Sequence, residues 1–246
     1  MSGVAEPLVL LHGFAGTRRG WDEVVARLGG QRYRPVALDL RGHGDAAHAR
    51  PIGFGACTAD VLAATGGRFA LCGYSQGARL ALRVALAAPD RVTRLVLLSA
   101  TAGIEEPAER AERRRADAVL AAEIEAGTIE AFADRWTTLP LFAGTPPAAL
   151  AAWRADILRN EPGGLAAALR GLGAGAMASL WDRLGELELP VPVVAGERDA
   201  RYRALAERLA EELPAARSVV VPGAGHGLPR EAAAGVAALQ EDGVAA

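Results

Sequence analysis

Residues 73–77 read Gly-Tyr-Ser-Gln-Gly and fit the pattern G-x-S-x-G, which exposes a reactive serine on a sharp turn. They follow an apolar run at residues 68–74 and open a helical pattern at residues 76–88, which is the strand–turn–helix context that this pattern requires. Small flanking residues relieve the crowding of strand against helix. The pattern predicts that Ser75 acts as a nucleophile or base; the alternative is a tight turn with a structural serine.

A reactive serine needs a histidine, and the histidine needs a carboxylate to orient it. Of the four histidines in the chain, His226 alone lies late in the sequence, in a glycine-rich loop past the last expected strand. Asp199 follows the strand expected at residues 191–197, whereas its competitor, Glu197, falls at the strand end itself. The order serine, acid, histidine therefore favours Ser75, Asp199 and His226 as a catalytic triad. The alternative for the histidine is a plain surface-loop residue.

An oxyanion hole should use two backbone amides. One is the amide after the serine, which belongs to Gln76. The other should come from the loop after the first strand, residues 12–16 (His-Gly-Phe-Ala-Gly), where we expect Phe14. His12 and His43 are interpreted as structural residues of turns.

Six short apolar runs bounded by turn residues must position these groups, and each fits a strand buried on both faces. The expected strands are residues 7–12, 34–40, 68–74, 92–99, 191–197 and 217–221. Helical patterns alternate with them, at residues 21–28, 55–64, 76–88, 201–213 and 230–239. This alternation predicts an α/β fold with an essentially all-parallel six-stranded sheet flanked by helices.

The alternation stops near residue 102 and resumes near residue 190. Between these points we expect four helices, opened by signals such as an N-cap Thr128 and the pair Thr145-Pro146. The helical patterns cover residues 107–125, 128–136, 146–159 and 163–171. We therefore predict an α/β core of residues 1–102 and 190–246, with an all-helical cap inserted at residues 103–189.

Composition excludes several classes of protein. Hydrophobic residues make up 51% and charged residues 23% of 246 residues, which excludes intrinsic disorder. The formal net charge of −2 lacks the basic excess of a nucleic-acid-binding protein. The absence of lysine excludes Schiff-base catalysis, and two cysteines cannot form a four-thiolate zinc site. No signal-peptide pattern or 18-residue apolar run occurs, so we expect a cytoplasmic protein that does not bind membranes.

The motifs together resemble the α/β-hydrolase superfamily over the whole chain: H-G-F, D-L-x-G-H-G, G-Y-S-x-G, G-E-x-D and A-G-H occur in that order. Within it the chain resembles the 2-succinyl-6-hydroxy-2,4-cyclohexadiene-1-carboxylate synthases of menaquinone biosynthesis. That narrower resemblance rests on residues 73–79, 110–117, 132–136, 139–142, 158–160, 165–175 and 196–202. It implies an α/β-hydrolase fold with a helical cap.

The resemblance also implies that Arg79, Arg113 and Arg159 bind substrate carboxylates and that Tyr74 and Trp136 line the pocket. Guanidinium groups suit carboxylates, and Arg79 lies one helical turn after the serine, on the same face. The alternative for Arg113 is a solvated charge in an arginine-rich helix, and Trp136 could equally be core packing within the cap.

The reaction that the resemblance implies is elimination of pyruvate from 2-succinyl-5-enolpyruvyl-6-hydroxy-3-cyclohexene-1-carboxylate, with the triad as base. It needs a small anionic substrate, no metal and no organic cofactor. The alternative activity is a carboxylesterase or C–C bond hydrolase that forms a seryl acyl-enzyme. A non-enzymatic receptor on the same scaffold is disfavoured because all three triad residues are present. The sequence does not indicate an oligomeric state.

Overall fold

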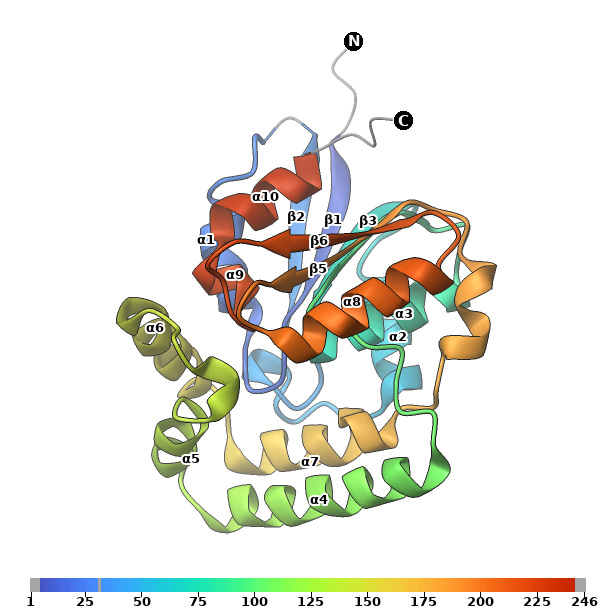
Figure 1. Cartoon of the computed structure of the whole chain (residues 1–246). Coiled ribbons are helices and arrows are strands. Elements are labelled where there is room, and N and C mark those ends of the chain that lie inside the picture. Colours follow the sequence, from blue (N-terminus) through green and yellow to red (C-terminus); the bar gives the residue numbers. More distant parts are fainter. Residues whose placement is uncertain (1–4, 31, 242–246) are drawn as a thin grey trace.

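The computed structural model of the chain describes residues 5–30 and 32–241, and its centre is a single six-stranded sheet (Figure 1). The strands are β1 (Glu6–Leu11), β2 (Tyr33–Leu38), β3 (Phe69–Tyr74), β4 (Val92–Leu98), β5 (Val191–Gly196) and β6 (Ala216–Val221). Their order is β2-β1-β3-β4-β5-β6, and every pair is parallel. The predicted parallel sheet of six strands is confirmed.

Helices cover both faces of the sheet, and each face has its own apolar cluster. One face carries α2 (Phe54–Ala63), α3 (Gln76–Ala87) and α8 (Ala200–Glu212). The other face carries α1 (Asp22–Val25), α9 (Leu228–Glu231) and α10 (Ala233–Glu241), as Figure 1 shows. Because β3 and β5 are buried along their whole length, continuous apolar runs in the sequence were sufficient to predict them.

The described chain between β4 and β5 is helical and lies beside the sheet, in the lower part of Figure 1. Its α-helices are α4 (Pro107–Ala126), α5 (Ile129–Trp136), α6 (Pro147–Ile157) and α7 (Pro162–Leu172). Short 3-10 turns cover Arg18–Trp21, Gly44–Ala46, Pro140–Phe142, Ala174–Ala176 and Trp181–Glu186. A third apolar cluster packs the four helices α4, α5, α6 and α7 together, and it includes Ala15 from the loop after β1. The division into core and cap stays a prediction.

Several helix bounds differ by a few residues from the sequence expectation, and two of the differences have a clear local cause. Thr128 caps α5 as expected, since its hydroxyl accepts a hydrogen bond from the Ala131 amide at 3.2 Å. Thr145 does not cap α6, which begins one residue later than expected because Pro147 takes the first helical position; the Thr145 hydroxyl donates instead to Glu231 at 3.3 Å. The last helix is also two helices, α9 and α10, because the backbone leaves the helical region at Ala232.

The strand order reverses between β1 and β3. These strands are neighbours in the sheet, but the helices that follow them, α1 and α3, pack on opposite faces of it. Ligands of open α/β sheets bind beyond the carboxyl ends of the strands at such a point. The loop after β1 and the turn after β3 therefore meet at one edge. Pairing of β4 with β5 is short, joining Leu97 to Val193 and Leu98 to Val194, and the Ser99 amide extends it by donating to the Val194 carbonyl at 2.8 Å.

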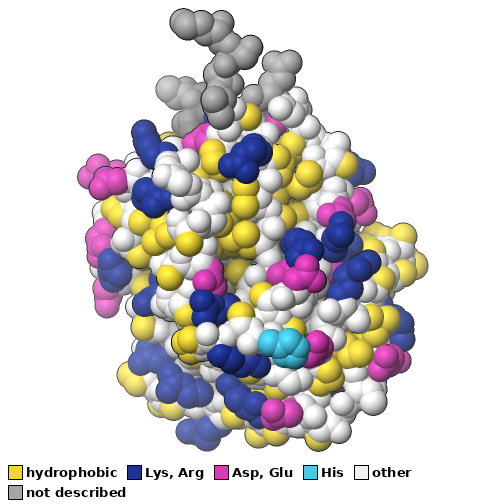
Figure 2. All heavy atoms as spheres, turned by 180° about the vertical axis from the view of Figure 1, so that it is seen from behind, with side chains coloured by type: hydrophobic (Ala, Val, Ile, Leu, Met, Phe, Trp, Pro, Cys, Tyr) yellow, Lys and Arg dark blue, Asp and Glu magenta, His cyan; other side chains and the backbone are white. Residues whose placement is uncertain are grey.

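No helix in the described ranges combines the length and the apolar character that a membrane span requires. Basic and acidic side chains are interspersed over the face shown in Figure 2, with the basic ones gathered toward its lower half.

Candidate active site

Ser75 lies on a strained turn between β3 and α3. Its backbone φ of 52° with ψ of −109° is a conformation that non-glycine residues rarely adopt. Glycines on either side make the turn possible, because a Cβ on Gly73 would fall on the main chain of Gly77, and a Cβ on Gly77 would fall on the main chain of Leu11 and His12. The G-x-S-x-G pattern thus reflects close packing of α3 against β1 and β3.

Replacing Gly77 by alanine should destabilise the fold by about 1–3 kcal/mol, because main chain rather than a flexible side chain blocks the new methyl group. The thermal unfolding midpoint, measured by circular dichroism, should fall by several degrees. Gly235→Ala is the matched control, since Gly235 lies in α10 and a methyl group added there would meet nothing within 4 Å. Equal midpoints for the two variants would contradict this account of the turn.

The structure brings Ser75, His226 and Asp199 together. His226 Nε2 lies 3.2 Å from Ser75 Oγ, and His226 Nδ1 lies 2.7 Å from Asp199 Oδ2. A carboxylate can only accept, so Nδ1 carries the imidazole proton and Nε2 is left to accept from the serine hydroxyl. This is the arrangement of a serine–histidine–acid relay. The catalytic roles of the three residues remain predictions.

Asp199 also begins α8, because its Oδ1 accepts a hydrogen bond from the Tyr202 amide at 3.2 Å. One carboxylate oxygen is thereby fixed by the helix N-terminus while the other faces the imidazole. The competitor Glu197 points elsewhere, since its Oε2 accepts from the Gly223 amide at 2.8 Å.

Glu231, which the sequence did not single out, holds the loop of His226. Its two carboxylate oxygens accept from the amides of Gly225 and Gly227, each at 2.9 Å, on either side of the histidine. Arg198 pairs with this buried carboxylate at 2.5 Å. The Ser99 hydroxyl donates to the His226 carbonyl at 3.1 Å. The histidine is therefore held on its main chain as well as on its ring.

Phe14 and Gln76, the expected oxyanion donors, lie at the same cavity as Ser75. The Phe14 amide donates no hydrogen bond to the described part of the chain, and the Gln76 amide opens α3, where no helical carbonyl precedes it. The loop after β1, which contains Phe14, lies against Ser75, since a Cβ on Gly13 would come within 3.4 Å of Ser75 Cβ. Both amides are free to meet a developing negative charge.

His12 and His43 occupy the structural positions expected of them. His12 Nε2 accepts from the Leu40 amide at 3.0 Å, and His43 Nε2 accepts from the Ala15 amide at 3.3 Å. Burial lowers the pKa of both histidines, so they are neutral at pH 7 and able to accept. Cys72 is equally inert, because burial raises the pKa of its thiol to about 12.

A cavity of about 580 Å³ opens above Ser75, within the size range of small-molecule sites. Its wall includes His226 and Asp199 of the expected triad, and Trp136, whose ring packs against Phe14 at 5.3 Å between centroids. Trp136 therefore lies at the pocket, as expected, and also packs in the core.

Arg79 and Arg113 line this cavity, but in different electrostatic states. Arg79 is buried, and no hydrogen bond or ion pair joins it to the described residues; its Nη1 is unpartnered. Burial, with a smaller effect of nearby Arg113, lowers the Arg79 pKa to about 10, which leaves it charged at pH 7. Arg113 is partly neutralised, because its Nε donates to Asp117 at 2.7 Å. Arg79 is thus the cation that most needs an anion.

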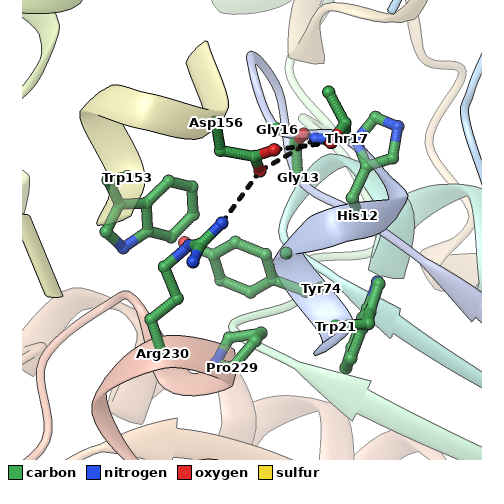
Figure 3. A pocket seen from close by; sticks show the side chains of 11 residues that line it. His12, Gly13, Gly16, Thr17, Trp21, Tyr74, Trp153, Asp156, Pro229 and Arg230 are labelled. Carbon is green, nitrogen blue, oxygen red and sulfur yellow. Dashed lines mark hydrogen bonds and ion pairs between the residues drawn. The ribbon is translucent and has the colours of Figure 1, made fainter. Parts of the chain in front are cut away.

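Two expected pocket residues lie elsewhere. Arg159 is absent from the cavity wall, its side chain is 58% exposed, and its nearest carboxylate is Asp156 at 4.0 Å. The structure thus brings Arg79 and Arg113, but not Arg159, to the cavity wall, and a substrate-binding role for Arg159 stays a prediction. Tyr74 lies in a separate small pocket beside Trp153 (Figure 3), and its ring centroid is 5.5 Å from that of His226. Tyr74, the last residue of β3, is therefore not in the wall of the cavity above Ser75, although its ring lies near His226.

Four residues of α8 that the sequence did not assign line the cavity: Arg201, Tyr202, Leu205 and Arg208. The Tyr202 ring lies 4.6 Å from the His226 ring, between centroids. Arg208 pairs with Glu105 at 2.6 Å and stacks on Trp181. The signal available was the position of Arg201 and Tyr202, two and three residues after Asp199.

Known proteins resemble this chain over most of its length. A model of the alpha/beta hydrolase family matches residues 8–239. A Bacillus subtilis (strain 168) protein, provisionally named 2-succinyl-6-hydroxy-2,4-cyclohexadiene-1-carboxylate synthase, is 35% identical over 90% of this chain and 84% of its own length. A Nitrosomonas europaea protein named pimeloyl-(acyl-carrier protein) methyl ester esterase is 32% identical over 92% of this chain and 90% of its own length. The solved structure of MenH from S. aureus has a TM-score of 0.89 at 29% identity, covering 96% of this chain and 92% of that one.

Proposed function

The chain belongs to the alpha/beta hydrolase family, and from that premise we propose that this enzyme eliminates pyruvate from 2-succinyl-5-enolpyruvyl-6-hydroxy-3-cyclohexene-1-carboxylate in menaquinone biosynthesis. The name of the B. subtilis relative and the fold shared with MenH from S. aureus support the proposal. We further propose a location in the cytoplasm, where reduced thiols such as Cys57 and Cys72 persist.

Arg79 carries the proposal. A buried guanidinium with no partner among the described residues is costly unless an anion joins it. It lines the same cavity as Ser75, so the anion would be part of the molecule that reacts there. The proposed substrate has carboxylates on its succinyl arm, ring and enolpyruvyl arm, whereas a neutral lipid ester has none. A polyanion therefore fits this cavity better than a neutral ester.

In the proposed reaction Ser75 and His226 act as one base. The serine removes the proton α to the succinyl carbonyl and passes its own hydroxyl proton to Nε2, which accepts it in the tautomer that the contact with Asp199 favours. The amides of Phe14 and Gln76 stabilise the enolate that develops on the carbonyl oxygen. The electron pair of the broken C–H bond then forms a ring double bond between carbons 2 and 3, the existing 3,4 double bond moves to carbons 4 and 5, and the C–O bond to the enolpyruvyl arm on carbon 5 breaks. The imidazolium gives its proton to the departing enolate, so that pyruvate leaves and the base is restored.

Ester or C–C bond hydrolysis is the second candidate. The same triad could attack a carbonyl directly and form an acyl-enzyme, and a relative 32% identical to this chain is named as a methyl ester esterase. In this candidate Arg79 would bind an acidic acyl group. The two candidates share the triad and the oxyanion amides and differ in whether a proton or a carbonyl carbon is attacked.

Arg79→Ala should lower kcat/KM for pyruvate release by about ten- to a hundredfold, the equivalent of roughly 1.5–3 kcal/mol for hydrogen bonds to a charged group. Arg79→Lys should recover part of the loss, since it restores the charge but not the two-pronged contact. A lactate-dehydrogenase-coupled assay measures pyruvate, beside hydrolysis of p-nitrophenyl acetate, which Arg79→Ala should leave nearly unchanged.

The matched control is Arg83→Ala, one turn further along α3 and outside the cavity wall, which should retain pyruvate release within about twofold. If Arg79→Ala released pyruvate as fast as the unmodified enzyme, the proposed substrate would be wrong. A wild-type enzyme that hydrolyses esters and releases no pyruvate would favour the second candidate.

A further inference from the structure

The C-terminal end of α6 holds the loop that follows β1. Two side chains four residues apart, Asp156 and Asn160, reach that loop from a segment about 140 positions away in the sequence. Figure 3 shows Asp156 extended toward Thr17 on one side and Arg230 on the other. The loop they contact contains Phe14, whose amide faces no acceptor in the described chain.

Asn160 is buried and binds two main-chain groups of different loops. Its Nδ2 donates to the Ala15 carbonyl at 3.0 Å, and its Oδ1 accepts from the Gly44 amide at 3.0 Å. Ala15 has a left-handed backbone with φ of 61°, which an alanine holds only when its surroundings impose it. Its amide is fixed as well, by His43. Both peptide groups of the residue next to Phe14 are thereby fixed.

Asp156 binds the same loop two residues further on. Its Oδ2 accepts from the Thr17 amide at 3.1 Å and its Oδ1 accepts from the Thr17 hydroxyl at 2.5 Å. This carboxylate is buried, so it requires these partners and the Arg230 guanidinium, which lies 3.1 Å away. Arg230 is four residues after His226. One buried carboxylate therefore joins α6 to the loop of Phe14 and to α9, the helix that follows the loop of His226.

We propose that Asp156 and Asn160 are positioning residues that fix the Phe14 amide as an oxyanion donor. The inference rests on the proposed function only in that Ser75 works with an oxyanion hole, which elimination and ester hydrolysis share. A purely structural pair would bind anywhere on the loop, but these bonds fall on positions 15 and 17, directly after the donor. Complete loss of one oxyanion donor lowers kcat by about 10²–10³-fold. A variant that only shifts the Phe14 amide should therefore lower kcat by less.

Asn160→Ala tests the proposal, because it removes the bond to Ala15 and leaves the ion pair of Asp156 in place. We expect kcat to fall by about ten- to a hundredfold while KM stays within about twofold. Phenylboronic acid provides a second readout: Ser75 Oγ adds to boron, His226 takes the hydroxyl proton, and a boronate oxygen meets the two amides. Its Kd should rise by a similar factor. The control is Arg154→Ala on the same helix, which breaks an exposed contact with Asp134 and touches no part of the loop.

Thr17→Val against Thr17→Ser is the second pair of variants, since valine removes the hydroxyl that donates to Asp156 and serine keeps it. We expect the valine variant to lose kcat and boronate affinity, and the serine variant to retain both. The proposal is overturned if Asn160→Ala and Arg154→Ala give the same kcat and the same boronate affinity, or if the wild-type enzyme does not bind the boronate. If the wild-type enzyme binds the boronate and hydrolyses p-nitrophenyl acetate but releases no pyruvate, only the proposed substrate is refuted. The kcat values of Asn160→Ala and Arg154→Ala are then compared for hydrolysis of that ester.

Discussion

Ser75→Ala should reduce kcat for pyruvate release by about 10²–10⁴-fold, the contribution typical of a positioned general base. The variant keeps the fold, because alanine differs from serine only by the hydroxyl that contacts His226 Nε2. Steady-state pyruvate release measures the effect, and the thermal unfolding midpoint checks the fold. Ser218→Ala is a matched control, since Ser218 is exposed on β6 and outside the cavity wall.

The size of the loss also separates the two candidate reactions. Without the hydroxyl, an elimination can still proceed with His226 acting on the substrate directly or through water. An acyl-enzyme pathway loses its nucleophile, and losses of about 10⁶-fold are known for that case. A Ser75→Ala variant with full activity would contradict both candidates and remove Ser75 from the mechanism.

Asp199→Asn should lower kcat by about 10⁴-fold at pH 7 while leaving the unfolding midpoint nearly unchanged. The amide oxygen can still accept from the Tyr202 amide and begin α8. The amide nitrogen then faces His226 Nδ1 and donates to it, so the imidazole proton moves to Nε2. Nε2 can no longer accept from Ser75, and the relay is interrupted although every group is in place.

Glu197→Gln is the control for that variant, because Glu197 is the competing carboxylate two residues earlier and binds the Gly223 amide. We expect its kcat to stay within about twofold of the wild-type value, as for surface substitutions. If Glu197→Gln lost the activity and Asp199→Asn kept it, the acid of the triad would be Glu197.

The sheet and the turn that carries Ser75 were predictable because their physical causes are local. A parallel strand covered on both faces must be apolar along its length, as in β3 and β5. The turn at Ser75 needs small residues two positions before and after it, where the neighbouring main chain leaves no room for a Cβ. These constraints appear as runs and spacings within a few residues of the sequence.

Side-chain direction and long-range partners were not predictable in this way. The motif containing Tyr74 specifies a residue type, but not which pocket its ring lines, and the ring lies in a pocket other than the cavity of Ser75. Arg159 matches a family segment, yet the turn after α6 leaves it exposed. Asp156 and Asn160 read as ordinary polar residues at a helix end, because the groups they bind lie 139 and 145 positions away.

The short pairing of β4 with β5 divides the candidate site between two structural units of unequal size. Ser75 belongs to the unit of four strands, whereas Asp199 and His226 follow β5 and β6. Proteins open in cooperative parts, and a seam of few hydrogen bonds is where such parts separate. Opening at Leu97–Leu98 would draw the imidazole away from the serine while the β2-β1-β3-β4 unit and its helices stayed folded. We therefore expect activity to be lost at a lower denaturant concentration than the one that unfolds the β2-β1-β3-β4 unit, because local opening at this seam costs less free energy than global unfolding.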